Sequence, residues 1–445
     1  MLNRPARFVA AAVAAASLAV LACCAGKPAE QPAADNTTAG PTAGTVTIEF
    51  WHYFTREHER ALKDMIAAFE KDNPGIKVRP VFQGNPQQLS QKLSSALAAT
   101  PPNNPALSTV YENWTSDYVA KGYMDPVENY FGGPDPFPRE DQEDIVRVFR
   151  QANEYDGKWV TMPFNKSIYV LYYNADMLAQ AGFTTAPSTL EEFGEMVRKT
   201  TVREGARTRV FGLGTMPSSE AFTTLLFALG GELMGPDGRA AFNSPEGLRA
   251  LTFIRDLQHP DKYIYVSSEY MSTPLGNGQI ASFIYSSASF PFVEKAVSGQ
   301  FRWEVAPIPG DPAKQPRYVM QGTNVGIFQN RPEAERRAAW KLLRYLLQTD
   351  QCVEWATRSG YMPVRYSMLE HPKMKEYLDK QPQYALASSL VLKDLGKQEP
   401  KVVPWEGVRS DLSTMVDRVI STGADPAAEL AAAEKKANDR LAAGK

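Results

Sequence analysis

The chain has 445 residues, which is too many for one compact core and enough for two lobes. Its formal net charge is -2 and 22% of its residues are charged, which excludes the strongly basic composition of a nucleic-acid-binding protein. Aromatic residues make up 11%, with 19 Tyr and 7 Trp, a supply that suits both a large core and a site that stacks on sugar rings.

The first 22 residues have the composition of an export signal. Arg4 and Arg7 supply a positive start, and residues 8–21 form an apolar run that is shorter than the ~20 residues a membrane-spanning helix needs. The run ends in Val-Leu-Ala before Cys23, which resembles the lipobox of bacterial lipoproteins. We therefore predict a signal peptide at 1–22 and lipidation of Cys23, with Cys24 as the alternative.

A tether is predicted between the lipid and the fold. Residues 23–44 are rich in Pro, Ala, Gly, Thr and Asn and contain almost no large apolar side chain, which is typical of disordered linkers. In the predicted folded part, from residue 45 on, the sequence contains one cysteine, Cys352, so a disulfide framework is not expected. Cys352 lies in an apolar-periodic run and is predicted to be a small core residue.

The folded part begins with alternating strands and helices. Strands are expected at 45–52, 76–82 and 107–111, and helices at 57–72 and 87–98. This alternation predicts a largely parallel sheet with crossover helices, in which ligands bind beyond the carboxyl ends of strands. The side chains that follow strand ends are therefore candidates for a cleft: Trp51, His52, Glu112 and Trp114.

The segment 159–174 is the most distinctive stretch of the chain. It follows the turn-forming pair Asp156-Gly157 and is rich in aromatic and β-branched residues. Residues 168–173 are apolar or aromatic throughout, which predicts a strand covered on both faces. A helix is expected at 176–182, closed by Gly182.

The second half repeats the mixture of helices and strands. Ser188, with Glu191 three residues later, predicts a helix N-cap. A strand at 279–289 breaks into a serine-rich turn, and further strands are expected at 301–309 and 318–328. Helices are predicted at 221–229, 245–257, 292–297, 332–347 and 425–443.

Several phrases resemble the extracellular solute-binding proteins (family 1) of ABC importers, in the branch that binds carbohydrates and glycerol 3-phosphate. They are Phe-Trp-His at 50–52, Pro-Phe-Asn-x-Ser at 163–167, Val-Leu-Tyr-Tyr-Asn-x-Asp at 170–176 and Gly-Tyr-Met-Pro at 360–363. The resemblance implies an α/β, two-lobed, periplasmic-binding-protein-like fold with hinge strands between the lobes.

The hinge strands are expected at 163–173 and 301–309. Lobe one is expected to comprise 45–165 plus 306–330, and lobe two 166–305 plus 331–445.

By motif match, the resemblance implies a set of ligand-binding residues scattered over both lobes. Glu112 would accept hydrogen bonds from glycerol hydroxyls, and Ser167 lies in the first hinge strand. A phosphate would be held by Ser289, the backbone of Gly322, Tyr361 and Arg409. Two departures from the branch keep a neutral sugar open as the ligand: Gly84-Asn85-Pro86 stands where a tyrosine is expected after Gly-Asn, and 211–229 lacks the expected tryptophan.

The function predicted from the sequence is that of a substrate-binding lipoprotein of an ABC importer and not of an enzyme. It would bind glycerol 3-phosphate or a glycerophosphodiester by hinge closure, or alternatively a neutral mono- or oligosaccharide. The four histidines show no metal-ligand spacing and no Gly-x-Ser-x-Gly motif is present, so neither a metal nor a cofactor is expected. The carboxylates are too numerous to exclude a glycosidase pair by counting, so a secreted lipoprotein hydrolase is the rival class.

The expected partners are a small-molecule ligand, the permease of an importer and the membrane through the N-terminal lipid. The protein is expected to be a monomer without nucleic acid. Its expected location is outside the cytoplasm, anchored to the outer face of the cytoplasmic membrane or in the periplasm.

Overall fold

The computed structural model of the protein describes residues 44–444. The predicted signal peptide, Cys23 and Cys24, and the tether up to residue 43 lie outside the described residues.

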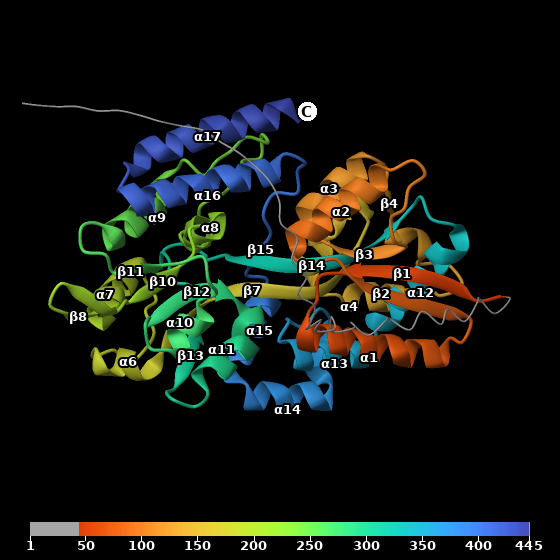
Figure 1. Cartoon of the computed structure of the whole chain (residues 1–445), viewed down its shortest axis with the longest axis horizontal. Coiled ribbons are helices and arrows are strands. Elements are labelled where there is room, and N and C mark those ends of the chain that lie inside the picture. Colours follow the sequence, from red (N-terminus) through yellow and green to blue (C-terminus); the bar gives the residue numbers. More distant parts are fainter. Residues whose placement is uncertain (1–43, 445) are drawn as a thin grey trace, which may run out of the picture. The chain divides into compact units, whose positions relative to one another are not determined.

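One mixed sheet of eleven strands organises the described chain, with helices on both of its sides (Figure 1). Parallel pairs at its two ends are linked through antiparallel pairs in the middle. The main order is β11 (Ile264–Val266), β10 (Leu213–Thr215), β12 (Ser282–Ser286), β7 (Met162–Asn174), β14 (Tyr318–Phe328), β3 (Leu107–Val110), β1 (Val46–His52) and β2 (Ile76–Phe82). Three short strands join this path: β13 (Trp303–Ala306), β15 (Gly396–Lys397) and β4 (Met124–Asp125).

Helices fill the connections, and two small hairpins stand apart from the sheet. Before β7 lie α1 (Arg56–Asp72), α2 (Pro86–Ala98), α3 (Glu112–Ala120), η1 (Val127–Tyr130), α4 (Arg139–Asp144) and α5 (Arg147–Ala152). Between β7 and β14 lie α6 (Ala175–Gln180), α7 (Leu190–Thr200), α8 (Ser219–Ala228), α9 (Pro245–Gln258), α10 (Ser272–Gly276), η2 (Ser287–Ser289) and α11 (Phe290–Val297). After β14 come α12 (Glu333–Leu346), α13 (Thr349–Ser359), η3 (Tyr366–Glu370), α14 (Pro372–Lys380), α15 (Pro382–Leu392), α16 (Trp405–Thr422) and α17 (Pro426–Ala443). The hairpins are β5 (Glu154–Tyr155) with β6 (Lys158–Trp159) and β8 (Val202–Glu204) with β9 (Arg207–Val210).

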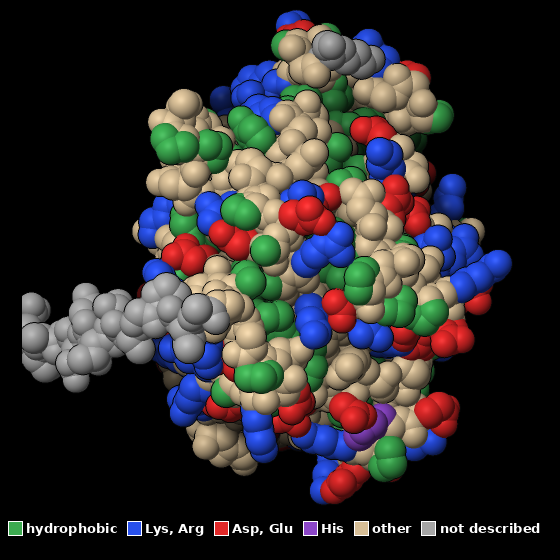
Figure 2. Space-filling model, turned by 90° about the vertical axis from the view of Figure 1, so that its right-hand side faces the viewer, with side chains coloured by type: hydrophobic (Ala, Val, Ile, Leu, Met, Phe, Trp, Pro, Cys, Tyr) green, Lys and Arg blue, Asp and Glu red, His purple; other side chains and the backbone are tan. Residues whose placement is uncertain are grey.

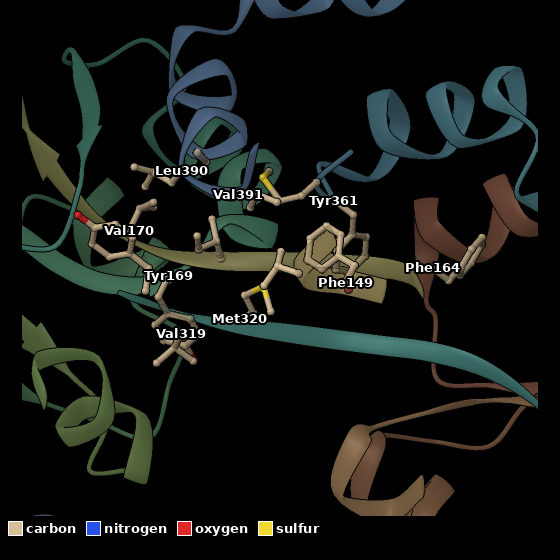
Figure 3. Close-up of a cluster of buried hydrophobic side chains, with 14 of the residues drawn as sticks. Phe149, Phe164, Tyr169, Val170, Val319, Met320, Tyr361, Leu390 and Val391 are labelled. Carbon is tan, nitrogen blue, oxygen red and sulfur yellow. The ribbon is translucent and has the colours of Figure 1, made fainter. Parts of the chain in front are cut away.

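Strand β7 connects the two ends of the sheet, as predicted for the segment 163–173. Its first half, 162–168, pairs with β14, and its second half runs between β12 and β13. Every residue of the strand except Tyr173 is buried, which confirms the expectation of a strand covered on both faces. Figure 3 shows the buried side chains that pack along β7 and β14, among them Val170, Val319 and Met320.

The prediction of a second hinge strand at 301–309 is wrong. Strand β13, within the predicted segment 301–309, pairs only with the second half of β7 and stays at the β12 end of the sheet. The strand that runs between the two ends alongside β7 is β14, which pairs with β3, with the first half of β7 and with β15. The two strands that cross between the ends of the sheet are therefore β7 and β14, and not β7 and β13. The reason is that the chain after β13 stays in the second lobe, where Gly310 bridges to Thr189.

The predicted lobe boundaries also need correction after residue 305. Residues 306–317 were assigned to lobe one, but Gly310 and Asp311 donate backbone hydrogen bonds to Ser188 and Ala228 of the second lobe. Helices α12 and α13 were assigned to lobe two, but they pack against β1 and α1 of the first lobe.

The helices expected from the sequence are present, whereas α3 and α13 to α16 were not predicted. The apolar stripe of α1 is buried, and Cys352 is a buried free thiol. Helix α7 begins one residue later than predicted, because Thr189 and Glu192 form the capping box in place of Ser188 and Glu191. Asn85 and Gln88 form a second capping box at the start of α2, which borders the cleft described next.

Candidate functional site

A cleft of about 710 Å³ is lined by α2 and α3, by the first turns of α8 and α16 and by β14. It lies beyond the carboxyl end of β3, because Tyr111 and Glu112 follow that strand directly. This is where open α/β sheets place their ligands. The volume is that of a small-molecule site.

Aromatic side chains form much of the apolar lining. The rings of Tyr111 and Trp114 meet edge to face with centroids 5.0 Å apart, and the exposed Tyr270 meets Tyr285 at 6.1 Å. Tyr118 and Trp405 also line the cleft, and Trp405 Nε1 donates a hydrogen bond to Glu399. Such rings offer flat apolar surfaces with polar rims, which suit sugar rings and other hydroxylated ligands.

Acidic side chains outnumber basic ones in this cleft. Two of the acids have partners of their own, since Lys166 pairs with Glu112 and Lys121 pairs with Asp117. The remaining acids surround a single guanidinium among the described lining residues. They are Glu220, Glu399 and Glu406 around Arg409.

Glu112 and Lys166 form a buried ion pair at one side of the cleft. Lys166 lies on β7 with 1% of its side chain exposed, and Glu112 begins α3 with 5% exposed. The ammonium donates to Glu112 Oε1 and, at 3.4 Å, to the carbonyl oxygen of Gly322. Asn324 Nδ2 donates to the same Oε1 at 3.0 Å. Burial lowers the pKa of Lys166, and the charge of Glu112 opposes that shift.

Arg409 forms a second, more open charge cluster on α16. Its guanidinium donates to Glu220 and to Glu399, and its Nε lies 3.8 Å from Glu406. Glu220 Oε1 also accepts from Gln321 Nε2 of β14 at 2.9 Å. About a quarter of the Arg409 side chain remains exposed, and Arg409 is one of the residues that line the cleft.

The two carboxylates beside Arg409 titrate in opposite directions. Burial acts to raise the pKa of Glu220, but Arg409 and hydrogen bonds lower it to about 2. Burial also raises the pKa of Glu399, and there Arg409 does not overcome it, because the charge of Glu220 adds to the rise. Both carboxylates nevertheless accept a hydrogen bond from the Arg409 guanidinium.

Of the eight ligand-binding residues predicted from the sequence, Glu112 and Arg409 line the cleft. Tyr361 is 7% exposed and contributes to the buried cluster of Figure 3. Its burial and its neighbour Tyr53 raise the pKa of its hydroxyl group. Ser167 is buried in β7 opposite Gln321, and Ser289 stands at the N-cap of α11 without a side-chain cap bond. Gly322 contributes its carbonyl to Lys166.

Position 322 can be occupied only by glycine. Its φ is +99°, and a Cβ at this position would lie 1.8 Å from the carbonyl oxygen of Asn165 on β7. The tight approach of β14 to β7 at this point brings the Gly322 carbonyl to Lys166.

Trp51 and His52 do not lie among the cleft residues, in contrast to the prediction. His52 is fully buried and packs against Phe50, Phe54 and Phe82. Its Nδ1 accepts from the backbone N–H of Phe54 at 3.2 Å, and burial lowers its pKa to about 4. Trp51 is half-buried and donates from Nε1 to Glu49 at 2.9 Å. The alternation of β1 explains the error, because His52 shares its face with the buried Ile48 and Phe50.

Four polar residues that shape the site were not predicted from the sequence: Lys166, Glu220, Gln321 and Glu399. Lys166 carried a signal, since a lysine inside a strand that is otherwise covered on both faces must find a buried partner. Glu220 and Glu399 carried none, because they lie 189 and 10 residues from Arg409 in the chain.

The described residues offer little support for a metal site or a membrane span. Within 44–444, no group of three or more His, Cys, Asp and Glu side chains could hold a metal ion. None of the helices in that range combines the length and the apolar character that crossing a bilayer demands. On the face shown in Figure 2, acidic and basic side chains are interspersed.

Comparisons with known proteins agree on a family. The family described as "Bacterial extracellular solute-binding protein" matches residues 64–382. The sn-glycerol-3-phosphate-binding periplasmic protein UgpB of Salmonella typhimurium is 26% identical over 364 residues, covering 79% of this chain and 82% of the relative.

Solved structures show the same fold. UgpB from Mycobacterium tuberculosis in complex with glycerophosphocholine superposes with a TM-score of 0.79 at 20% identity, covering 90% of this chain and 99% of that one. The GacH receptor of Streptomyces glaucescens, solved unliganded and with acarbose, gives a TM-score of 0.76 at 18% identity, covering 90% of this chain and 100% of that one. These neighbours are two-lobed solute-binding proteins, as the predicted fold class requires.

Proposed function

Because the chain belongs to the family of bacterial extracellular solute-binding proteins, we propose that it captures a glycerophosphodiester for an ABC importer. The observation that carries the proposal is that Arg409 and Glu112 line one cleft. A guanidinium offers a fork of donors that matches phosphate oxygens, and a carboxylate accepts hydrogen bonds from glycerol hydroxyls. The resemblance to UgpB proteins, one of which holds glycerophosphocholine, supports this ligand class.

The charges of the cleft favour a diester over a free phosphate monoester. Glu220, Glu399 and Glu406 face a single guanidinium, so an incoming dianion meets surplus negative charge. A phosphodiester carries one negative charge, and a cationic head group on it would find both the surplus acids and the aromatic rings. A zwitterionic diester therefore complements this cleft better than glycerol 3-phosphate does.

The Nε donor of Arg409 is used by neither of its two tighter pairs, to Glu220 and Glu399. Its Nε lies 3.8 Å from Glu406, whose side chain is 66% exposed. An ion pair this long and this exposed contributes little to stability. The phosphate of the ligand takes the place of Glu406 at this donor, while Glu220 continues to hold the guanidinium in position.

Capture works by closure of the two lobes about β7 and β14. Ligand contacts from α3 on one lobe and from α16 on the other favour the closed form, which the permease then recognises. In this proposal α12 and α13 move with lobe one, and residues 306–317 move with lobe two. The protein acts as a monomer.

A neutral oligosaccharide is the second candidate ligand, and the aromatic lining of the cleft favours it. Tyr111, Trp114 and Tyr285 provide ring surfaces, and the acids provide acceptors for hydroxyls. On this reading Arg409 serves to hold Glu220 and Glu399 in place.

Calorimetric titration separates the two candidates. Wild-type protein is titrated with glycerophosphocholine, glycerol 3-phosphate and maltotriose. We expect tight binding of the diester, weaker binding of the monoester and no binding of the sugar. Binding of maltotriose with no binding of either ester would overturn the diester assignment. The ligand is recovered after the titration, and its chemical change would favour the rival hydrolase.

Anchoring through lipid on Cys23 forms part of the proposed function. Because acyl chains supply the energy of membrane attachment, Cys23→Ala should release the protein from the membrane fraction or leave its signal peptide uncleaved. Cys24→Ala is the matched control and should change neither. Membrane fractionation together with electrophoretic mobility tests both variants, and a membrane-bound, processed Cys23→Ala protein would contradict the assignment.

A further inference from the structure

Lys166 is a buried cation for which ligand-binding motifs supplied no role. It lies in the middle of β7 with 1% of its side chain exposed. An ammonium group is removed from water at high cost unless it is paired and hydrogen-bonded. A lysine kept in such a place therefore has a specific partner, which is the cleft residue Glu112.

The position of Lys166 joins three elements of the fold. Its ammonium reaches Glu112 at the start of α3 and the carbonyl of Gly322 on β14. Its own backbone carbonyl accepts from the N–H of Met362 at 2.7 Å. The ammonium group of Lys166 thus lies between the two crossing strands, β7 and β14. The positive φ of Gly322 brings its carbonyl oxygen within reach of this ammonium.

The contacts of Glu112 leave its two oxygens with different tasks. Oε1 accepts from both Lys166 and Asn324, which fixes the orientation of the carboxylate. Oε2 is the oxygen left for a ligand in the cleft, since among the described residues it has no hydrogen-bond partner in the protein. A carboxylate oxygen can only accept, so the ligand atom that meets it must carry a hydrogen.

We propose that Lys166 is a positioning residue that determines specificity: it orients Glu112 so that this side of the cleft selects a ligand hydroxyl. The inference rests on the proposed function and deepens it. Since the charges of Lys166 and Glu112 balance, this side does not attract an anion, and the phosphate of a diester goes to Arg409. The glycerol end of the ligand therefore faces β7 and α3, and its head group faces the aromatic side.

The test compares two ligands in several variants. Wild type is titrated with glycerophosphocholine and with its analogue in which both glycerol hydroxyls are replaced by hydrogen. Wild type should bind the parent at least about 100-fold more tightly than the analogue, because the buried acceptor is then left without a donor. Lys166→Met should reduce this ratio at least tenfold. A general loss of stability lowers both affinities together and leaves the ratio unchanged.

Two further variants make the result independent of whether Lys166→Met folds. In Lys166→Met/Glu112→Gln both charges are absent, and the ratio should stay below about tenfold. Lys397→Met is the matched control: this lysine, with 24% of its side chain exposed, also pairs with a carboxylate, but its partner is Glu232. It should keep the wild-type ratio.

The outcomes separate this inference from the proposed function. A wild-type protein that binds neither compound would overturn the diester proposal and this inference with it. A wild-type protein that prefers the parent, with a folded Lys166→Met or double variant that keeps the full ratio, would overturn the role of Lys166 and leave the diester proposal standing.

Discussion

The two charge clusters of the cleft differ in balance and in exposure. Lys166 and Glu112 form a closed pair, one cation with one anion, almost completely buried. Arg409 faces three carboxylates and keeps about a quarter of its side chain exposed. A closed, balanced pair fixes geometry, whereas an open cluster with surplus charge can exchange one partner for a ligand. In the proposed function, the closed pair orients the ligand on one side of the cleft and the open cluster recognises its charge on the other.

Breaking the closed pair should have the largest effect on stability. Lys166→Met leaves a buried carboxylate without its cation, which typically costs about 3–5 kcal/mol of unfolding free energy. Denaturant unfolding measures this loss. Lys166→Met/Glu112→Gln should recover most of it, because no uncompensated charge remains. Equal stabilities of the single and double variants would show that the pair does not act as a unit.

Acidification should weaken the open cluster in a defined range. The folded pKa of Glu220, about 2, is below its ordinary value of 4.5, so its contribution is complete above pH 4.5 and is lost as pH falls toward 2. The shift corresponds to about 3 kcal/mol. The difference in unfolding free energy between wild type and Glu220→Gln should therefore shrink by this amount from pH 5 to pH 2. A difference that stays constant with pH would contradict the pairing.

Removing the cation of the open cluster should weaken binding of the diester in addition to its cost in folding stability. Arg409→Ala should weaken glycerophosphocholine by at least about tenfold, or 1.4 kcal/mol, since charge-assisted hydrogen bonds to the phosphate are lost. Glu112→Gln should instead weaken every ligand that carries the recognised hydroxyl. Calorimetric titration of both variants separates the two sides of the cleft. An Arg409→Ala protein with unchanged affinity for the diester would place the phosphate elsewhere.

Removing one of the surplus acids around Arg409 should raise the affinity for the diester, and this is the smallest effect expected. Glu399→Gln removes one anion that competes with the ligand for Arg409, so affinity for the diester should rise by about threefold, or roughly 0.7 kcal/mol. Burial raises the pKa of Glu399, so in wild type the affinity should also rise as pH falls and this residue takes up a proton. The variant should lose that pH dependence. Titrations at a series of pH values test both statements, and a weaker-binding variant would contradict them.

The sequence was most informative where the signals were local. The helices and strands up to 111, the buried strand at β7 and the strand at 318–328 were predicted to within two residues, because hydrophobic periodicity and turn residues mark them. The family resemblance supplied Glu112 and Arg409. The alternation along β1 places His52 on the same buried face as Ile48 and Phe50. In the structure this alternation decides the position of His52, and not its place at the end of a strand.

The remaining features depend on contacts between distant residues. Lys166 and Glu112 are 54 positions apart, and Glu220 is 189 positions from Arg409, so no local pattern links either pair. The same applies to β13 and β14, which both pair with β7: β13 meets its second half, whereas β14 meets its first half and also pairs with β3. Pairing partners decide their roles, and those are set by the completed sheet.

The place of β14 in the sheet has a consequence for biosynthesis. The N-terminal lobe contains β1, β2 and β3, yet the edge of β3 is completed only by residues 324–327 of β14. Helices α12 and α13, which cover β1 and α1, come later still. A nascent chain therefore cannot finish its first lobe until about four fifths of it has emerged, and closing such long-range contacts is slow. For a protein that is exported, this delay keeps the polypeptide open during translocation, and it makes the unpaired edge of β3 a site that a holding chaperone would protect.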